Sequence, residues 1–372
     1  MRKLFLFLSL FLAVALRAQA PMDGSVWKAT DGQHINAHGG SIIRYGGSYL
    51  WYGETRSATG KPYSSLGVSL YTSKDLQHWT NHGLVLKVND TPGSDLEGGC
   101  IIERPKVLYN ARTRKFVMWF HLELKGKGYA AARAAVAVSD TPQGPFRLIS
   151  SGRVNAGQYP IGFCLPDTTD LRHQLLYPEL KKWWTPEWRR QIERGMFFMR
   201  DLDGGQMARD QTVFVDDDGK AYHIYSSEDN MTLNIAQLTD DYLAHNGSFV
   251  RVAAGGQNEA PTIFKRNGIY WMITSGCTGW APNAARLFMA KNIFGPWKQL
   301  PNPCRGEGAD KTFGAQGTYI FKVETARERK LFGGADYVFM ADIWKPKELS
   351  DSRHLWIPIR FEDGMPVLHK AR

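Results

Sequence analysis

Cysteine is scarce in this sequence, with four residues among 372: Cys100, Cys164, Cys277 and Cys304. Their wide, irregular spacing differs from the framework of a small disulfide-stapled domain, and no Cys-x-x-Cys pair indicates a redox or metal centre. Four cysteines allow three disulfide pairings, and buried free thiols fit the spacing equally well. A chain of this length can instead bury a large apolar core.

Signatures of several catalytic chemistries are also missing. The sequence has no Gly-x-Ser-x-Gly nucleophile elbow, no His-Glu-x-x-His motif and no phosphate-binding glycine loop. Asp216-Asp217-Asp218-Gly219 is acidic enough to suggest calcium but lacks the ligand spacing of an EF-hand loop, so we interpret it as a turn. These motifs predict no metal site.

Long apolar runs are confined to the amino terminus. Two basic residues precede an apolar run over residues 4–16, and small residues end at Ala20. This pattern predicts a signal peptide over residues 1–20, cleavage near Ala20, and a mature domain over residues 21–372 that is secreted or periplasmic. No later run approaches the roughly 18 apolar residues of a transmembrane helix, so we expect no membrane span.

The positive charge of the chain is mostly dispersed. The formal net charge is +10, or about +7 without the three basic residues of the predicted signal peptide, with one local concentration over residues 181–194. We interpret this as tolerance of acidic polysaccharide or lipopolysaccharide, and the secretion signal argues against a nucleic-acid partner. We expect a monomer.

Internal repetition dominates the rest of the sequence. Two β-rich runs joined by a turn recur as hairpins around Gly46-Gly47, at Glu103, around residues 216–219 and around Asn267-Gly268, and three of these four turns contain glycine. Each hairpin is followed by a short strand, a polar connection and a further strand, and a degenerate fifth round spans residues 312–361. This alternation predicts an all-β, single-domain, five-bladed β-propeller, whereas a two-sheet sandwich would not need it.

The repeat is interrupted once, between the second and third hairpins, by an insertion of about residues 149–206. It contains three tryptophans, Trp183, Trp184 and Trp188. Thr185 followed by a proline, with Gly195 nine residues after that proline, predicts a short capped helix. The tryptophans suit either stacking on sugar rings or ordinary packing.

Residues that open the inner strand of each blade converge at one mouth of a propeller's channel. In chain order these positions hold His38, Glu103, Asp210, Glu259 and Gln316. Ion pairing with nearby arginines could account for any one of these acids, but packing alone would not select the whole set. Paired carboxylates suit glycoside hydrolysis, because one acid protonates the leaving oxygen and crowding of like charges raises its pKa.

Seven short motifs carry a family resemblance that spans about residues 31–361. They are Asn36-Ala37-His38-Gly39-Gly40, Trp51-Tyr52-Gly53-Glu54, Glu103-Arg104-Pro105-Lys106-Val107, Arg209-Asp210, Glu259-Ala260-Pro261, Gly276-Cys277-Thr278-Gly279-Trp280 and Gln316-Gly317-Thr318-Tyr319. With these motifs the chain resembles glycoside hydrolase family 43, in its exo-β-1,3-galactanase branch. The resemblance implies a secreted, inverting enzyme that releases terminal galactose from β-1,3-linked galactan.

The resemblance also implies catalytic roles. Glu259 matches the general acid and Asp210 the residue that modulates its pKa. The catalytic base of the family is usually an aspartate in blade one, but this sequence has Gly39 and Gly40 at about that position. In this branch a glutamine, here Gln316, is thought to position the attacking water. Since a neutral amide is a poor base, either its imidic tautomer acts or Glu103 takes part.

The remaining expectations concern binding and alternatives. The substrate-binding residues implied by the resemblance are Glu54, Tyr129, Thr278 and Trp280, and we add His38. No cofactor is expected to be required, although a calcium or other cation in the central channel is compatible with the family. Other activities on this fold are α-L-arabinofuranosidase, β-xylosidase and galactofuranosidase, and a non-catalytic glycan-binding propeller is a further alternative.

Overall fold

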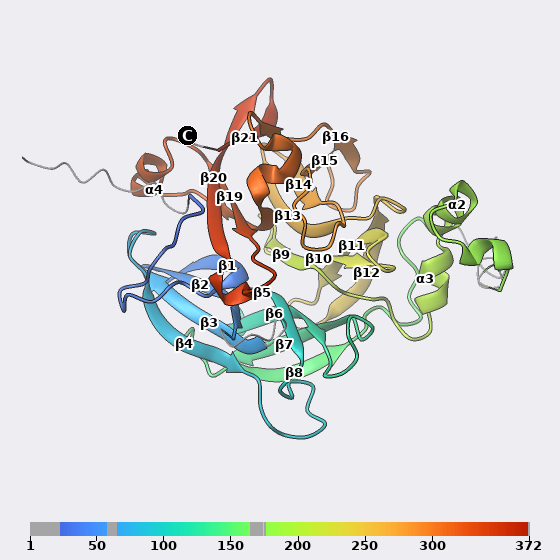
Figure 1. Ribbon diagram of the computed structural model, residues 1–372, viewed down its shortest axis with the longest axis horizontal. Coiled ribbons are helices and arrows are strands. Elements are labelled where there is room, and N and C mark those ends of the chain that lie inside the picture. The colour runs from blue at the N-terminus through green and yellow to red at the C-terminus, as the bar shows by residue number, and fades with distance from the viewer. Residues whose placement is uncertain (1–22, 58–64, 164–173, 175, 371–372) are drawn as a thin grey trace, which may run out of the picture.

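The computed structural model describes residues 23–57, 65–163, 174 and 176–370 (Figure 1). The predicted signal peptide and Cys164 lie outside these residues. Within them, Cys100, Cys277 and Cys304 form no disulfide with one another. None of the helices in these segments is both long and apolar enough to cross a bilayer.

Five antiparallel sheets form the body, which confirms the predicted five-bladed propeller. Blade one contains β1 (His38–Tyr45), β2 (Ser48–Arg56), β3 (Ser65–Ser73) and β4 (Thr80–Lys87). Blade two contains β5 (Ile101–Asn110), β6 (Lys115–Glu123), β7 (Arg133–Ser139) and β8 (Arg147–Gly152). Blade three contains β9 (Gln211–Val215), β10 (Ala221–Ser227), β11 (Thr232–Leu238) and β12 (His245–Val252).

Blade four contains β13 (Glu259–Arg266), β14 (Ile269–Ser275), β15 (Arg286–Ala290) and β16 (Lys298–Leu300). Blade five contains β18 (Gln316–Lys322), β19 (Tyr337–Ile343), β20 (Arg353–Glu362) and β21 (Met365–His369), with the short β17 (Cys304–Arg305) parallel to β21. The strands β1, β5, β9, β13 and β18 contact one another as an inner ring. Blade five also has three short helical segments next to its strands in the sequence: η3 (Ala309–Gly314), α4 (Ala326–Leu331) and η4 (Leu349–Asp351).

Glycine-containing turns form the hairpins of blades one and four. In blade one Tyr45 pairs with Ser48, so the loop is only Gly46-Gly47, with φ values of 57° and 69°. In blade four Asn267 and Gly268 have φ values of 51° and 75°. Two left-handed residues match the twist of the flanking strands, which is why these dipeptides predict hairpins.

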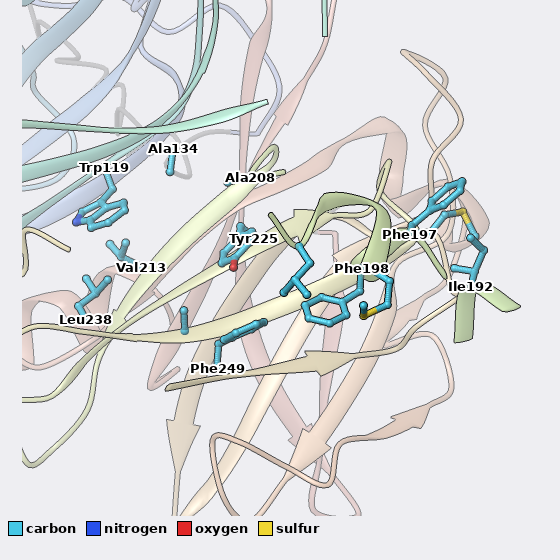
Figure 2. Packing of buried hydrophobic residues seen from close by; sticks show 14 of the residues in the cluster. Trp119, Ala134, Ile192, Phe197, Phe198, Ala208, Val213, Tyr225, Leu238 and Phe249 are labelled. Carbon is cyan, nitrogen blue, oxygen red and sulfur yellow. The ribbon is translucent and has the colours of Figure 1, made fainter. Parts of the chain in front are cut away.

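Apolar side chains fill the spaces between neighbouring blades. Trp51 of blade one, for example, packs against Trp79 and against Trp356 of blade five, with ring centroids 5.2 and 5.6 Å apart. The core between blades two and three extends outward into the insertion, where Ile192 and Phe198 join Phe249 of β12 (Figure 2).

The insertion forms η2 (Pro178–Lys181), α2 (Pro186–Arg194) and α3 (Met196–Asp201), which lie beside blade three in Figure 1. The predicted helix caps are confirmed: the Thr185 hydroxyl accepts a hydrogen bond from the Trp188 amide, and Gly195 ends α2 with φ 110°. Trp188 is fully buried, whereas Trp183 and Trp184 are 43% and 52% exposed. The three tryptophans therefore divide between packing and surface.

Candidate active site

Four of the inner strands shift register close to their first residues, β18 between Gly317 and Tyr319, and the other three share one pattern. Strand pairing shifts register between His38 and Ser41 in β1, between Glu103 and Lys106 in β5, and between Glu259 and Thr262 in β13. The residue after each leading polar residue is left-handed, with φ of 58° at Gly39, 55° at Arg104 and 51° at Ala260. Such bulges bend a strand and redirect its side chains.

A cavity of about 240 Å³ lies beside these bulges. Seven of the nine residues predicted from the sequence line it: Glu54, Glu103, Tyr129, Asp210, Glu259, Trp280 and Gln316. Its wall is completed by Arg104, His121, Arg209, Asn230, Gly279 and Trp344. The structure therefore brings side chains of all five blades to one site.

Glu259 opens β13 and is held by neutral donors. The Asn230 amide donates to its Oε1 at 2.7 Å, and the Cys277 thiol is a second hydrogen-bonding neighbour. Burial, followed by the negative charge of Asp210, raises the pKa of Glu259 to about 7, although Arg104 opposes the shift. A carboxyl with this pKa is partly protonated near neutral pH and can serve as a general acid.

Arg104 links Asp210 to Gln316 across the channel. Its Nη2 lies 3.1 Å from Asp210 Oδ2 and donates to Gln316 Oε1 at 2.6 Å. Asp210 Oδ2 also accepts a hydrogen bond of 3.0 Å from the Ala260 amide. Asp210 is thus held beside the backbone that carries Glu259, which explains how its charge affects the pKa of Glu259.

The amide of Gln316 has a fixed orientation. Its Oε1 accepts hydrogen bonds from Arg104 and from Trp344 Nε1, the latter at 2.9 Å, and its Nε2 donates to Ser275 Oγ at 2.9 Å. Arginine and tryptophan side chains can only donate, so the atom that faces them is the carbonyl oxygen. In the imidic tautomer Oε1 would carry a hydrogen, and this hydroxyl would face two N–H donors. The hydrogen-bond network therefore favours the amide form of Gln316.

Glu103 belongs to a buried ionic network. Its Oε2 lies 3.1 Å from His121 Nδ1, and its Oε1 accepts from Tyr129 at 2.8 Å and from Arg56 at 3.4 Å. Burial alone would raise the pKa of Glu103, but His121 and Arg56 lower it to about 2. Conversely, burial alone would lower the pKa of His121, but Glu103 and Glu123 raise it to about 9. Glu103 is therefore a stable carboxylate and a weak base.

Glu54 and Glu103 both contact Arg56, but the pKa of Glu54 is raised whereas that of Glu103 is lowered. Arg56 Nη2 donates to Glu54 Oε2 at 2.9 Å, yet burial raises the pKa of Glu54 to about 7. A Cβ atom added at Gly39 would lie 3.3 Å from Glu54 Oε1. The Glu54 carboxyl therefore lies next to the blade-one position where the family usually has its base.

Side chains are excluded from that blade-one position by close backbone contacts. A Cβ at Gly39 would lie 3.2 Å from the Arg104 amide nitrogen, and a Cβ at Gly40 would lie 2.0 Å from the Tyr52 carbonyl oxygen. The Gly39 amide donates to Asp342 Oδ2 at 2.6 Å. Gly39 thus allows blade one to approach blade two closely, and Gly40 allows β1 to approach β2 within blade one.

His38 and Thr278 do not line the cavity, contrary to the prediction. His38 is fully buried and stacks on His354 with ring centroids 4.8 Å apart, so its ring packs in the channel and cannot reach a sugar. The Thr278 hydroxyl is engaged by Ala281 and Asn283 in its own loop. That loop brings Gly279 and Trp280 to the cavity instead.

The channel residues do not fit a calcium ion. His38 and His354 offer imidazole nitrogens together with one carboxylate, Asp342. Calcium requires six to eight oxygen ligands, and both Asp342 oxygens already accept hydrogen bonds, from His354 and from Gly39. A second cluster, formed by Glu103, His121 and Asp210, is neutralised by neighbouring arginines.

Six residues of the wall were not predicted as functional candidates: Arg104, His121, Arg209, Asn230, Gly279 and Trp344. A signal existed for His121, because it pairs directly with Glu103 across the β5–β6 hairpin. Trp344 meets Trp280 edge to face, with centroids 5.7 Å apart, and forms an aromatic side of the cavity. Aromatic faces of this kind suit the apolar faces of sugar rings.

The channel of this five-bladed propeller holds a glutamic acid with a raised pKa, a second carboxylate and aromatic side chains. This combination of fold and site is that of a glycoside hydrolase. Residues 188–318 match the model of glycosyl hydrolases family 43. A solved family 43 β-1,3-galactosidase, in complex with galactodeoxynojirimycin, is 55% identical over 94% of this chain and 98% of its own, with a TM-score of 0.87. This chain belongs to glycoside hydrolase family 43.

Two more distant relatives extend the comparison. The solved exo-β-1,3-galactanase from Clostridium thermocellum is 36% identical over 94% of this chain, with a TM-score of 0.72, and the match spans 64% of that longer protein. A β-D-galactofuranosidase from Aspergillus niger is 28% identical over 99 residues, which are 26% of this chain and 28% of that protein.

Proposed function

We propose that this enzyme removes terminal galactose from β-1,3-linked galactan by inverting hydrolysis. The observation that carries the proposal is the 55% identity, over nearly the full length of both chains, to a β-1,3-galactosidase solved with a galactose-like ligand. The galactofuranosidase relative matches only 99 residues. It therefore gives weaker support to the alternative, specificity for galactofuranose. The raised pKa of Glu259 argues against a non-catalytic glycan-binding role.

In the proposed mechanism Glu259 protonates the leaving glycosidic oxygen. Asp210 keeps the pKa of Glu259 high enough for this task, because a neighbouring negative charge disfavours its ionised form. Gln316, held through its carbonyl oxygen, uses its amide to orient the attacking water. Trp280 and Trp344 contact the terminal sugar.

Of the two remaining carboxyls in the cavity wall, Glu54 is the better acceptor for the water's proton. Its pKa of about 7 suits a general base near neutral pH, whereas the pKa of Glu103 is about 2 and its oxygens are occupied by donors. Glu54→Gln should therefore remove the acidic limb of the pH–rate profile. Glu103→Gln should retain that limb, and the opposite result would assign the base to Glu103.

The function is tested with a substrate panel. Nitrophenyl β-galactopyranoside, β-galactofuranoside, α-L-arabinofuranoside and β-xyloside are compared with β-1,3-galactobiose and β-1,3-galactotriose, and the products are identified. We expect galactose from the β-1,3-galactosides, released first as the α-anomer in a time-resolved NMR spectrum. Preferential cleavage of another glycoside, or no cleavage, would contradict the proposal.

The cellular setting is part of the same proposal. The leader over residues 1–20 supports export and action outside the cytoplasm on a polysaccharide, as a monomer without a required cofactor. Amino-terminal sequencing of the exported protein would locate the cleavage site, which we expect near Ala20. Light scattering would give the oligomeric state.

A further inference from the structure

Three consecutive residues directly after β10 have an unusual backbone. Glu228, Asp229 and Asn230 have φ values of 52°, 55° and 65°. Left-handed conformations are uncommon for residues other than glycine and are retained only where the surroundings impose them. The turn is closed by a hydrogen bond of 3.0 Å from the Met231 amide to the Glu228 carbonyl, which is too little to hold three such residues.

Ion pairs hold the first two residues of this turn. The fully buried Glu228 accepts two hydrogen bonds from Arg251, at 2.6 Å from Nε and 2.8 Å from Nη2. Asp229 accepts from Arg200 at 2.7 Å and from Arg209 at 3.2 Å. A two-pronged arginine contact fixes direction as well as distance, so these arginines impose the conformation of the turn.

Helices α2 and α3 supply the other side of this clamp. Arg200 belongs to α3, and Arg251 Nη2 also donates to the Ile192 carbonyl at 2.8 Å, in the last turn of α2. Arg189 of α2 donates to the Gly255 carbonyl at 2.9 Å, four residues before Glu259. Phe198 of α3 lies next to Phe249 of β12, with ring centroids 6.4 Å apart, and Ile192 of α2 belongs to the same apolar cluster (Figure 2).

Asn230, the third residue of the turn, is the one that reaches the reaction centre. Its Nδ2 donates to Glu259 Oε1 at 2.7 Å, and its carbonyl accepts from the Asn258 amide at 3.1 Å. Because an amide Nδ2 only donates, Oε1 must be the accepting oxygen, and the proton of the neutral acid is left on Oε2. The turn thus determines which oxygen of Glu259 carries the proton.

We propose that α2 and α3 orient the Glu259 carboxyl through the clamped turn at residues 228–230, with Asn230 and Arg200 as positioning residues. The inference rests on the proposed role of Glu259 as general acid. The insertion then belongs to the catalytic apparatus, although its helices do not line the cavity.

The test compares leaving groups. Release of galactose from β-1,3-galactobiose needs protonation of the leaving oxygen, whereas 2,4-dinitrophenyl β-galactoside releases a stable anion and needs little. General acid catalysis contributes about 10²–10⁴-fold. We therefore expect Arg200→Gln and Asn230→Ala each to lower kcat on galactobiose by about tenfold or more while changing kcat on the dinitrophenyl substrate less than about threefold.

Two further variants serve as controls. Arg190→Gln removes an exposed arginine of α2 that pairs with Glu187, and both kcat values should stay unchanged. Arg200→Lys, which keeps the charge, should recover part of the galactobiose activity. Arg200 does not line the cavity, so KM should change little in its variants.

Equal losses on both substrates, or no loss, would overturn the inference, because a merely structural role affects both substrates alike. Glu259→Gln separates this failure from failure of the proposed function. If Glu259→Gln shows the leaving-group dependence and the clamp variants do not, only the inference is wrong. If Glu259→Gln lacks it, the assignment of the acid is wrong.

Discussion

Asp210→Asn offers a direct test of the electrostatics in the cavity. Burial and the Asp210 charge together raise the pKa of Glu259 to about 7. A single charge at short range shifts a neighbouring pKa by about 1–3 pH units. Removing it, while Arg104 retains its positive charge, should therefore lower the pKa of Glu259 by at least about one pH unit.

The consequence for activity follows from the protonated fraction of Glu259. If its pKa falls from about 7 to about 6, the protonated fraction at pH 7 falls from about one half to about one tenth. The alkaline limb of the kcat/KM profile, measured on β-1,3-galactobiose from pH 4 to 9, should move to lower pH, with an additional loss at all pH values.

The matched control is Asp218→Asn, which removes a carboxylate that pairs with Lys220 on an exposed turn. Its profile should equal that of the parent enzyme. An alkaline limb that stays in place, or moves to higher pH, in Asp210→Asn would refute the reasoning, because a neighbouring anion can only raise the pKa of a carboxylic acid.

Three further outcomes are expected. Glu259 has a pKa of about 7 in the fold against 4.5 as its ordinary value, so its ionisation costs stability as pH rises through that window; Glu259→Gln should raise Tm at pH 8 and leave it unchanged below pH 4.5 in thermal melts. Trp280→Ala should raise KM for galactobiose about tenfold with a smaller change in kcat, if the ring binds ground and transition states alike; an unchanged KM would exclude contact with the sugar. Trp79→Ala, in a fully buried site, should cost about 3–5 kcal/mol in urea unfolding, and a loss below about 1 kcal/mol would contradict the packing described.

The architecture was predictable because its determinants are local. Gly46-Gly47 and Asn267-Gly268 require left-handed backbone, and the β-branched and aromatic runs on either side require strands. Repetition of this unit then limits the fold to a propeller. The caps of α2 were likewise predictable from Thr185 and Gly195.

The site was only partly predictable, because its geometry depends on contacts between blades. Arg104 reaches Asp210 and Gln316 through a bulge in which a non-glycine residue is left-handed, and a sequence pattern does not reveal this conformation. The position of Asn230 depends on ion pairs that its neighbours Glu228 and Asp229 form with arginines elsewhere in the sequence. His38 was assigned to the substrate because it opens an inner strand, but its ring lies too deep in the channel.

The glycine pair in blade one has a consequence for how this enzyme could change over time. Substitution of Gly40 by aspartate would not restore the usual family base, because its Cβ would lie 2.0 Å from the Tyr52 carbonyl oxygen. At Gly39 the obstacle is the Arg104 backbone, the same residue that orients Gln316. A side chain at either glycine would therefore require the backbone around Tyr52 or Arg104 to shift, and a shift at Arg104 would also disturb the residue that orients Gln316.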